Sequence, residues 1–498
     1  MNLRVVISGL DVALPLDVEL VLKFQNSLLE DKNDDVTYPF TIPLKVNRNI
    51  FGDIDRIVQN SFNPEFPSVV LFGPYELLRG FATITDITSK EVELYISTAK
   101  MSFWRKATNI MVRDCNIGSE DFANETEAVM AMNRSLQGEK NYVTCPLFDE
   151  NFTETTLLPP AEALFQKVFN PYNINTKQFS FVLDGKTCVY LPFMRLKFVI
   201  EELIKWFGYR VGKNCLNYIE GFQDILIVNR SGMNPKPRLF NFRHCLPYIS
   251  VKDFFADIEK KFNLVFWVDV NRKEISIENF NSILTGEPFS ILVEDGVDKK
   301  FDDDNKTGYR FKDKDISDST LDSIKSSLEW EVGEGDFKQI DCISTPVNTI
   351  HDGINRGANQ NNIAIINYSN VNVYPLFDKS VVSEFRLAVY RGYYKRNGLP
   401  ASTEPYMSPE PEWDESTPIN LTWVRGLSTL HRDKVNFLVK SRILHEIKVQ
   451  RKIEYIRSVK DLLCRAVVIS GQKYVTKEVE IKLGKDNVVE FVYRGYPL

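Results

Sequence analysis

Histidine and cysteine are scarce in this chain, and neither occurs at the spacing that a metal or redox site needs. The four histidines, His244, His351, His431 and His445, form no HExxH motif, the helical arrangement in which two imidazoles bind one catalytic zinc ion. The seven cysteines are scattered, odd in number and never spaced CxxC, which argues against a disulfide framework or a structural zinc site. We expect reduced thiols, no metal and no cofactor.

The chain also lacks the short motifs that position phosphates and nucleophiles. It contains no GxxxxGK[ST], GxGxxG or GxSxG sequence, so the backbone devices of phosphate binding and of the nucleophile elbow are missing. His244 and Cys245 are the one His/Cys adjacency, and neighbours on a strand point to opposite faces, which keeps a dyad apart. We predict that the chain is not an enzyme and has no catalytic residue.

Long apolar runs are absent as well. No stretch reaches the roughly 18 apolar residues that span a bilayer, and residues 1–20 alternate instead of combining a basic start with an apolar core. The formal net charge is only −6 for 498 residues, which argues against a general nucleic-acid binder. We expect a soluble protein that is not exported and has no membrane-spanning segment.

Apolar and aromatic side chains, in contrast, are abundant. The composition is 43% hydrophobic and 26% charged, and it includes 34 Phe and 20 Tyr, which supplies ample surface for burial and argues against global disorder. A chain of this length exceeds what one core organises, so about three or four folded units are expected.

Residues 193–280 contain two copies of a helix–hairpin sequence pattern, and the second copy is the clearer one. Ser250 is a predicted N-cap and Asn263 a predicted helix end. The apolar stripe between them comprises Val251, Phe254, Phe255, Ile258 and Phe262. Two β-branched and aromatic runs, 264–270 and 274–278, come next around a polar turn and predict a hairpin.

The first copy repeats the stripe 55 residues earlier. Its apolar positions are Leu196, Ile200, Leu203 and Phe207, and Gly208 is the predicted helix end. Strand candidates follow at 209–211 and 224–228. We therefore predict two αββ modules, each with helices on one face of an antiparallel sheet, an arrangement built for packing rather than for chemistry.

Both ends of the chain are rich in short strands. Residues 1–100 contain six strand candidates separated by Asp, Asn, Pro and Gly, typical of a β-barrel or sandwich. Residues 437–445, 465–483 and 487–496 also alternate as strands, with Gly471 at a hairpin turn. The predicted fold is α+β and β-rich. The predicted units are an N-terminal β-barrel (1–105), a connecting region (106–190), the tandem modules (191–282), a β region that forms part of a second barrel (283–380) and a C-terminal β region that completes it (381–498).

Two long segments are predicted to lie on the surface. Residues 345–380 are rich in asparagine, which predicts an exposed loop or hairpin tip. Residues 400–418 combine five prolines with acidic residues, and we predict that they hold no regular element and lie on a surface or between subunits.

Residues 423–460 are locally basic, with ten Lys or Arg against three acids and a balance of +7. Such a segment is typical of an ordinary solvated face. The alternatives are that it faces an acidic partner, such as the 400–418 segment of a neighbouring subunit, or a nucleic-acid backbone. The sequence leaves these three interpretations open.

Five blocks of the chain resemble one protein family. They are residues 37–52, 78–97, 197–211, 249–280 and 464–483. Together they are similar to the tail hub proteins (baseplate hub, late control D-like) of phages and prophages, particularly those of Bacteroidetes hosts. The resemblance is diffuse and extends across most of the chain.

This resemblance implies a structural virion protein that is made in the host cytoplasm and is not catalytic by itself. Hubs of this kind have tail-tube-like antiparallel β-barrels, and three subunits form a pseudo-sixfold ring that joins the tail tube to a central spike or tip. The implied partners are two further copies of the chain and other tail proteins, with DNA only in transit through the axial channel. The resemblance also implies that two discontinuous barrels flank the helix–hairpin region.

A tail-associated enzyme that cleaves the cell wall stays an alternative, because an acidic chain always offers the carboxylate pair that glycoside hydrolysis needs. If a ring surrounds DNA, a strongly basic wall would hold the phosphate backbone, so we expect the basic residues of 423–460 away from the channel. The candidate assembly contacts are Arg442, Arg451, Lys452 and Trp413.

Overall fold

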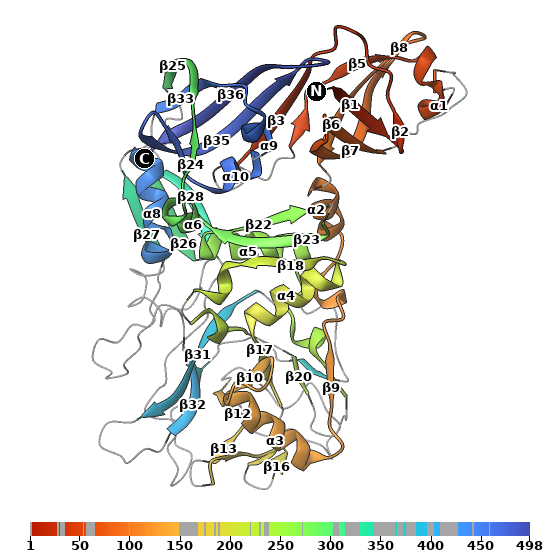
Figure 1. The fold of residues 1–498 in the computed structure, drawn as a ribbon. Coiled ribbons are helices and arrows are strands. Elements are labelled where there is room, and N and C mark those ends of the chain that lie inside the picture. The colour runs from red at the N-terminus through yellow and green to blue at the C-terminus, as the bar shows by residue number, and fades with distance from the viewer. Residues whose placement is uncertain are drawn as a thin grey trace.

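The computed structural model has a broad β layer at one end and an inserted region that extends away from it (Figure 1). The described part of the chain is α+β and β-rich, as predicted. The structure describes residues 2–26, 29, 35–52, 54–55, 65–98, 100–148, 168–173, 176–183, 186–187, 190–219, 221–228, 231–233, 239–270, 272–301, 308–313, 329–333, 335, 337–342, 364–365, 372–374, 385–395, 403–408, 427–440, 443–457 and 459–498.

The N-terminal β unit, residues 2–98, contains the six predicted strand regions. Its strands are β1 (Leu3–Ile7), β2 (Leu10–Asp11), β3 (Leu20–Gln25), β4 (Val36–Thr37), β5 (Phe40–Pro43), β6 (Phe66–Phe72), β7 (Tyr75–Ile87) and β8 (Glu91–Thr98). Alternate positions of these strands are buried, as expected for a sheet with one face on a core. Helix α1 (Arg48–Phe51) lies between β5 and β6.

The C-terminal β unit combines residues 289–301 with residues 443–498. Its strands are β24 (Phe289–Ile291), β25 (Val293–Phe301), β33 (Ile443–Val449), β34 (Val467–Ile469), β35 (Gln472–Leu483) and β36 (Val488–Pro497), and its helices are α9 (Ile453–Arg457) and α10 (Val459–Cys464). The predicted turn at Gly471 is confirmed: it has φ 84° and Ser470 has φ 51°, the left-handed pair that a tight hairpin requires.

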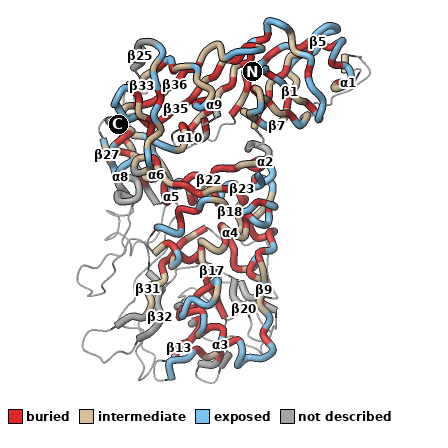
Figure 2. The backbone as a smooth tube through the Cα atoms, in the orientation of Figure 1, coloured by how far each residue is buried: buried red, intermediate tan, exposed pale blue. Residues whose placement is uncertain are grey.

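One sheet joins the two units. Strand β3 pairs antiparallel with β35 from Leu20↔Leu483 to Gln25↔Glu478, and the pairing path runs β2-β1-β6-β7-β8-β4-β3-β35-β36-β33-β25. Buried side chains of both units belong to one core cluster, which includes Leu22, Ile481 and Phe491. Figure 2 shows this burial across the whole layer. The two ends of the chain therefore share one sheet and one core, because strands far apart in the sequence pair with each other.

The inserted region has its own core, drawn mainly from residues 103–277. Its helices are α2 (Lys100–Thr108), α3 (Glu125–Leu136), α4 (Leu196–Trp206) and α5 (Val251–Phe262). Helix α6 (Phe280–Thr285) follows, and it buries Phe280 and Ile283 in the core of the joined sheet. The longer strands of the inserted region are β18 (Arg210–Asn214), β22 (Leu264–Asp269) and β23 (Glu274–Asn279). Short strands complete it: β9 (Ser119–Asp121), β10 (Tyr142–Thr144), β11 (Leu147–Phe148), β12 (Val168–Phe169), β13 (Tyr172–Asn173), β14 (Gln178–Phe179), β15 (Val182–Leu183), β16 (Lys186–Thr187), β17 (Pro192–Met194), β19 (Ile225–Ile227), β20 (Ser231–Met233) and β21 (Leu239–Asn241).

The predicted connecting region is part of this core. Tyr142, Val143 and Phe169 are buried in it. Helix α3 lies in the predicted connecting region, and it begins with an Asn-x-x-Glu sequence in which Glu127 bonds the residue before the N-cap, a variant of the capping box. Asn124 Oδ1 accepts the Glu127 N–H at 2.9 Å, and the Glu127 carboxylate accepts the Ala123 N–H at 2.7 Å.

The second helix–hairpin module is confirmed. Ser250 caps α5 by accepting the Asp253 N–H at 3.0 Å, and Asn263 ends the helix in the left-handed region with φ 54°. Strands β22 and β23 pair antiparallel from Leu264↔Asn279 to Asp269↔Glu274.

The first module is a helix without a hairpin, so that half of the prediction is wrong. Strand β18 pairs in parallel with β23, whereas β19 pairs with β31 (Leu387–Lys395). The reason is that β23 has one edge open beside its hairpin partner, and β18 fills that edge. Alternation in sequence identifies a strand but does not identify its neighbour.

The predicted boundaries of the last two units also need correction. Strand β31 pairs with β19 and β32 (Thr403–Ser408), so it joins the inserted region instead of the C-terminal sheet. Residues 400–418 therefore hold a strand, whose Pro405 is tolerated because β32 lies at the edge of its sheet. Residues 437–440 belong to α8 (Leu427–Lys440), not to a strand.

Three described strands between residues 308 and 342 form a separate sheet. It comprises β26 (Gly308–Asp313), β27 (Glu329–Gly333) and β28 (Phe337–Cys342), with β26 in the centre. Of the asparagine-rich segment, the structure describes β29 (Ala364–Ile365), which pairs with β11, and β30 (Asn372–Tyr374), which pairs with β20. The loop prediction for the remainder lies outside the described residues.

Candidate assembly surface

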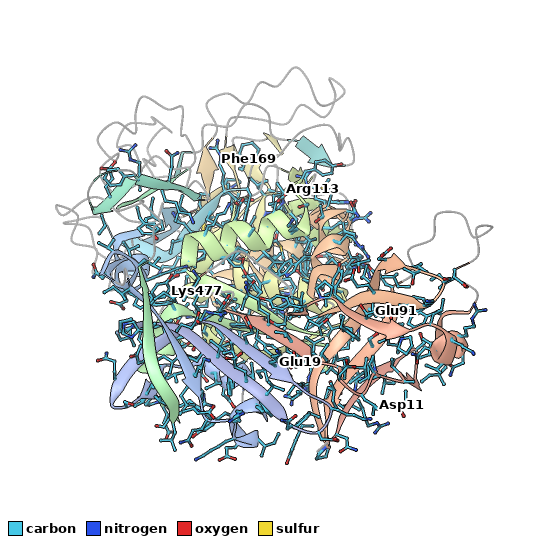
Figure 3. All side chains as sticks on the ribbon, turned by 90° about the horizontal axis from the view of Figure 1, so that it is seen from above. Asp11, Glu19, Glu91, Arg113, Phe169 and Lys477 are labelled. Carbon is cyan, nitrogen blue, oxygen red and sulfur yellow. The ribbon has the colours of Figure 1, made fainter. Side chains whose placement is uncertain are left out.

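The outward face of the joined sheet is polar because alternate side chains of β3, β33, β35 and β36 point away from the core. Residues paired across an antiparallel ladder share a face, and the register places Lys23, Glu480, Val492 and Lys448 in one row. The residues between them, such as Ile481, are fully buried on the other side. Figure 3 looks onto this layer, with Asp11 and Glu91 on the N-terminal unit and Lys477 on the C-terminal unit.

An ion network crosses the seam, which we define as the pairing of β3 with β35. Lys23 Nζ lies 2.9 Å from Glu478 Oε2. Arg494 Nε donates to Glu446 at 2.7 Å, and its Nη1 donates to Glu480 at 3.2 Å and also to Glu478. One guanidinium thus bonds carboxylates on two flanking strands, and Glu478 links it to the N-terminal unit.

These groups are held in their charged forms. Burial of Glu478 opposes its ionisation, but hydrogen bonds from Lys23 and Arg494 outweigh burial and lower the pKa of its carboxyl group. Burial likewise opposes the charge of Arg494, and its hydrogen bonds to Glu446, Glu478 and Glu480 outweigh burial and raise its pKa. Because both side chains are mostly covered, their network is less screened by solvent than an exposed pair would be.

Buried hydrogen bonds lock the same seam from the core side. Asn26 is fully buried at the end of β3, and its side-chain amide donates to the carbonyls of Leu463 at 3.0 Å and Thr476 at 2.7 Å. Thr476 Oγ1 in turn donates to the Leu462 carbonyl at 2.5 Å. The N-terminal unit is therefore anchored to both α10 and β35, and a rigid orientation of the two units is expected.

The charges on the outward face balance. Four cations and four carboxylates of β3, β33, β35 and β36 point from it: Lys23, Lys448, Lys482, Arg494, Glu446, Glu478, Glu480 and Glu490. Each cation forms an ion pair, since Lys448 contacts Glu490 at 3.1 Å and Lys482 contacts Glu19 at 2.5 Å. This face presents no block of unpaired positive charge among the described residues.

The pairing path of the described strands ends at β2 on one side and at β25 on the other. Near β2, the buried Asn47 ties two loops together by bonding Ala13 N at 2.8 Å and Pro43 O at 2.9 Å. These loops expose Leu16 at 82% and Val46 at 60%. At the other end Leu292, just before β25, is 51% exposed. Among the described strands, both ends of the sheet therefore combine an edge that no further strand pairs with and exposed apolar side chains.

The solved structures that match this chain include two that match along nearly its whole length. One is the 43 kDa tail protein of prophage MuSo2 from Shewanella oneidensis, with a TM-score of 0.36, 6% identity, and coverage of 99% of this chain and 97% of that chain. The other is a tail protein from Neisseria meningitidis MC58, with a TM-score of 0.33, 8% identity, and coverage of 99% and 96%. With TM-scores this low, these likenesses carry no argument about function. No family model and no curated protein matches the chain.

The predicted assembly contacts are only partly described. Arg451 Nη2 lies 2.5 Å from Glu294 Oε1, and its Nη1 donates to the Val489 carbonyl at 3.2 Å. Arg451 therefore ties β36 to the start of β25 within the chain, at the end of the sheet. The Lys452 ammonium lies 5.7 Å from the centre of the Tyr455 ring. Arg442 and Trp413 lie outside the described residues, and their role stays a prediction.

Sequence reasoning missed the seam network and Asn26. The alternating charges of residues 477–482 are readable in the sequence as one polar strand face. What the sequence could not show is that the facing strand comes from residues 20–25, more than 450 positions away. Buried asparagines of this kind carry no distinctive signal in a single sequence.

His244 and Cys245 lie in a 3₁₀ turn, Phe242–Cys245, rather than on a strand as predicted. Burial, with Arg243 and Arg113 nearby, lowers the pKa of His244 to about 4, so the imidazole is neutral at pH 7. The Cys245 side chain is buried. The Arg243 Nε group lies 3.4 Å from His244 Nε2.

The described part of the chain contains neither a membrane-spanning helix nor a metal cluster. None of the described helices has the length and apolar run that a membrane crossing requires. Within the same residues, no three His, Cys, Asp or Glu side chains gather in a way that could hold a metal ion.

Proposed function

We propose that the chain is a structural phage tail protein, a hub that assembles with further copies of itself around an axial path for DNA. The observation that carries this proposal is the single sheet that unites two β units built from opposite ends of the chain. In any ring that it forms, such a subunit contributes two β units whose mutual orientation is fixed by the shared sheet. The five sequence blocks that resemble tail hubs support the same role.

We propose that copies of the chain contact each other through the two ends of the sheet. An end-to-end contact between copies brings different surfaces together, and such heterologous contacts close into rings when the rotation allows. The exposed Leu16 and Val46 at one end and Leu292 at the other supply apolar area for that contact. A trimer is the ring size that we propose, with other tail proteins bound above and below it.

The balanced outward face suits a DNA path. A wall with many unpaired Lys and Arg would bind phosphates through counterion release and oppose passage. Here the cations of β3, β33, β35 and β36 on the outward face each contact a carboxylate. We propose that this face lines or borders the channel, that Lys448, the basic residue of 423–460 on this face, is neutralised there by Glu490, and that the chain itself is not an enzyme.

The experiment compares two exposed positions. Leu16→Glu should convert a ring to monomers in size-exclusion chromatography with light scattering and in electron microscopy, because a carboxylate replaces an apolar contact. Tyr218→Glu is the matched control, since Tyr218 is 85% exposed on the inserted region and should leave the ring intact.

A parent protein that stays monomeric at high concentration would contradict the hub proposal. So would an axial channel whose wall consists of basic residues of 423–460 that lack a carboxylate partner, because that arrangement would favour nucleic-acid binding. Zymography of the purified chain on host cell walls tests the enzyme alternative, and lytic bands would overturn the purely structural role.

A further inference from the structure

Three elements of the inserted region end at one place on its surface: the C-terminus of α2, the C-terminus of α4, and the turn between β22 and β23. Phe103 of α2 packs edge-on against Phe207 and Tyr209, with ring centres 5.1 and 5.3 Å apart. The Arg210 N–H donates to the Lys273 carbonyl at 2.7 Å, which joins the end of α4 to the turn. Figure 1 shows α2 next to the sheet of β22 and β23, with β18 between β23 and α4.

Two exposed lysines cover these rings. The Lys106 ammonium lies 5.6 Å from the centre of Phe207, and the Lys273 ammonium lies 5.0 Å from the centre of Tyr209. Both rings are 8% exposed, so the lysine stems shield them while the charged ends reach solvent. The attraction between cation and ring face holds each ammonium in place.

The cations here outnumber the carboxylates. The other four cations each pair with an acid: Arg105 with Glu65, Lys205 with Glu202, Arg210 with Glu274, and Arg272 with Asp269. Lys106 and Lys273 form no salt bridge with any carboxylate in the described part of the chain. The six cations and four carboxylates together have a net charge of +2, which comes from Lys106 and Lys273.

An exposed indole lies among these charges. Trp206 is 39% exposed and packs edge-on against Phe207 with ring centres 5.1 Å apart. A half-covered tryptophan beside oriented cations is the composition that protein interfaces favour at their energetic centres. We call the six cations and Trp206 the cation–aromatic patch.

We infer that the cation–aromatic patch binds an acidic, extended segment of another protein. Carboxylates of the segment meet Lys106 and Lys273, and an apolar side chain between them covers Trp206. The four carboxylates paired with cations of the patch disfavour nucleic acid, because a phosphate backbone carries closely and regularly spaced charges and would meet Glu202, Asp269 and Glu274. A peptide can place its few carboxylates on the two available ammonium groups alone.

The test uses the full chain and a short fluorescein-labelled peptide of alternating Glu and Tyr, with fluorescence anisotropy at low salt. The double variant Lys106→Gln and Lys273→Gln should weaken binding by about tenfold, the combined effect of two exposed ion pairs. Trp206→Ala should weaken it independently. Lys477→Gln is the matched control, because Lys477 lies 5.8 Å from the Tyr496 ring on the C-terminal unit and should leave affinity unchanged.

Glutamine keeps most of the lysine stem, so the rings stay covered and the variants should fold, which circular dichroism checks. The inference is overturned if the parent does not bind the peptide, if Lys477→Gln weakens binding as much as the double variant, or if an oligothymidine of equal charge binds as tightly. The ring experiment with Leu16→Glu addresses a different surface, so the two proposals can fail separately.

Discussion

The two helix-containing segments of the inserted region share a stripe but differ in the pairing of their next strand. Helices α4 and α5 bury their stripes equally, with Leu203 at 0% and Phe255 at 1% exposure, and both pack on the sheet β18-β23-β22. After α5 the chain turns back locally, and β22 pairs with β23. After α4, in contrast, β18 pairs in parallel with the other edge of β23. A helical stripe thus predicts burial, while the pairing of the next strand depends on which edge is open.

The largest expected effect tests whether the two helices are equivalent. Leu203→Asp and Phe255→Asp should each abolish soluble folded protein, because each buries an unpaired carboxylate at a cost of several kcal/mol. Soluble yield and thermal melting measure the outcome. Lys252→Asp, on the exposed side of α5, is the control and should melt like the parent. If one stripe variant melts normally while the other does not, the two helices are not equivalent.

The second prediction separates the central strand from the edge strand. Ile277 of β23 is fully buried and lies between two strands, so Ile277→Ala should cost about 2–5 kcal/mol in unfolding free energy. Val211 of β18 is only partly buried, and Val211→Ala should cost less than half as much. Urea denaturation provides both values. Equal losses would mean that β18 is as central to the core as β23.

Sequence reasoning succeeded where the signal is local. The stripe of α5, the cap Ser250 and the turn at Gly471 each depend on residues within one helix or hairpin, and all are confirmed. It failed where distant strands compete for an edge, as with β18, β31 and the seam. Lys23 and Glu478 each lie in a segment whose sequence alternates like any strand. Only the fold brings Lys23 Nζ to 2.9 Å from Glu478 Oε2.

The third prediction concerns the two helix starts. Ser250 accepts the Asp253 N–H and donates to its carboxylate at 2.7 Å, so Ser250→Ala should cost about 1 kcal/mol in unfolding free energy, and Ser250→Asn should recover most of it. The N-cap of α4 is Arg195, whose side chain makes no capping bond. Its guanidinium instead donates to the Gln223 carbonyl at 2.7 Å. Arg195→Ala should therefore destabilise the docking of 221–228 rather than α4, which hydrogen exchange of the two segments would distinguish.

The smallest expected effect tests the two helix ends. Gly208, the residue after the C-cap of α4, has φ 80° and no atom within 4 Å of an added Cβ, so only backbone conformation opposes a side chain there. Asn263, the C-cap of α5, is also left-handed, with φ 54°. Because asparagine tolerates that region better than alanine, Gly208→Asn should change the unfolding free energy by less than about 0.5 kcal/mol, and Gly208→Ala should cost about 1 kcal/mol. Urea denaturation of the pair measures the difference. Equal values would show that the end of α4 is fixed by its contacts with β18 and the turn, and not by the left-handed residue.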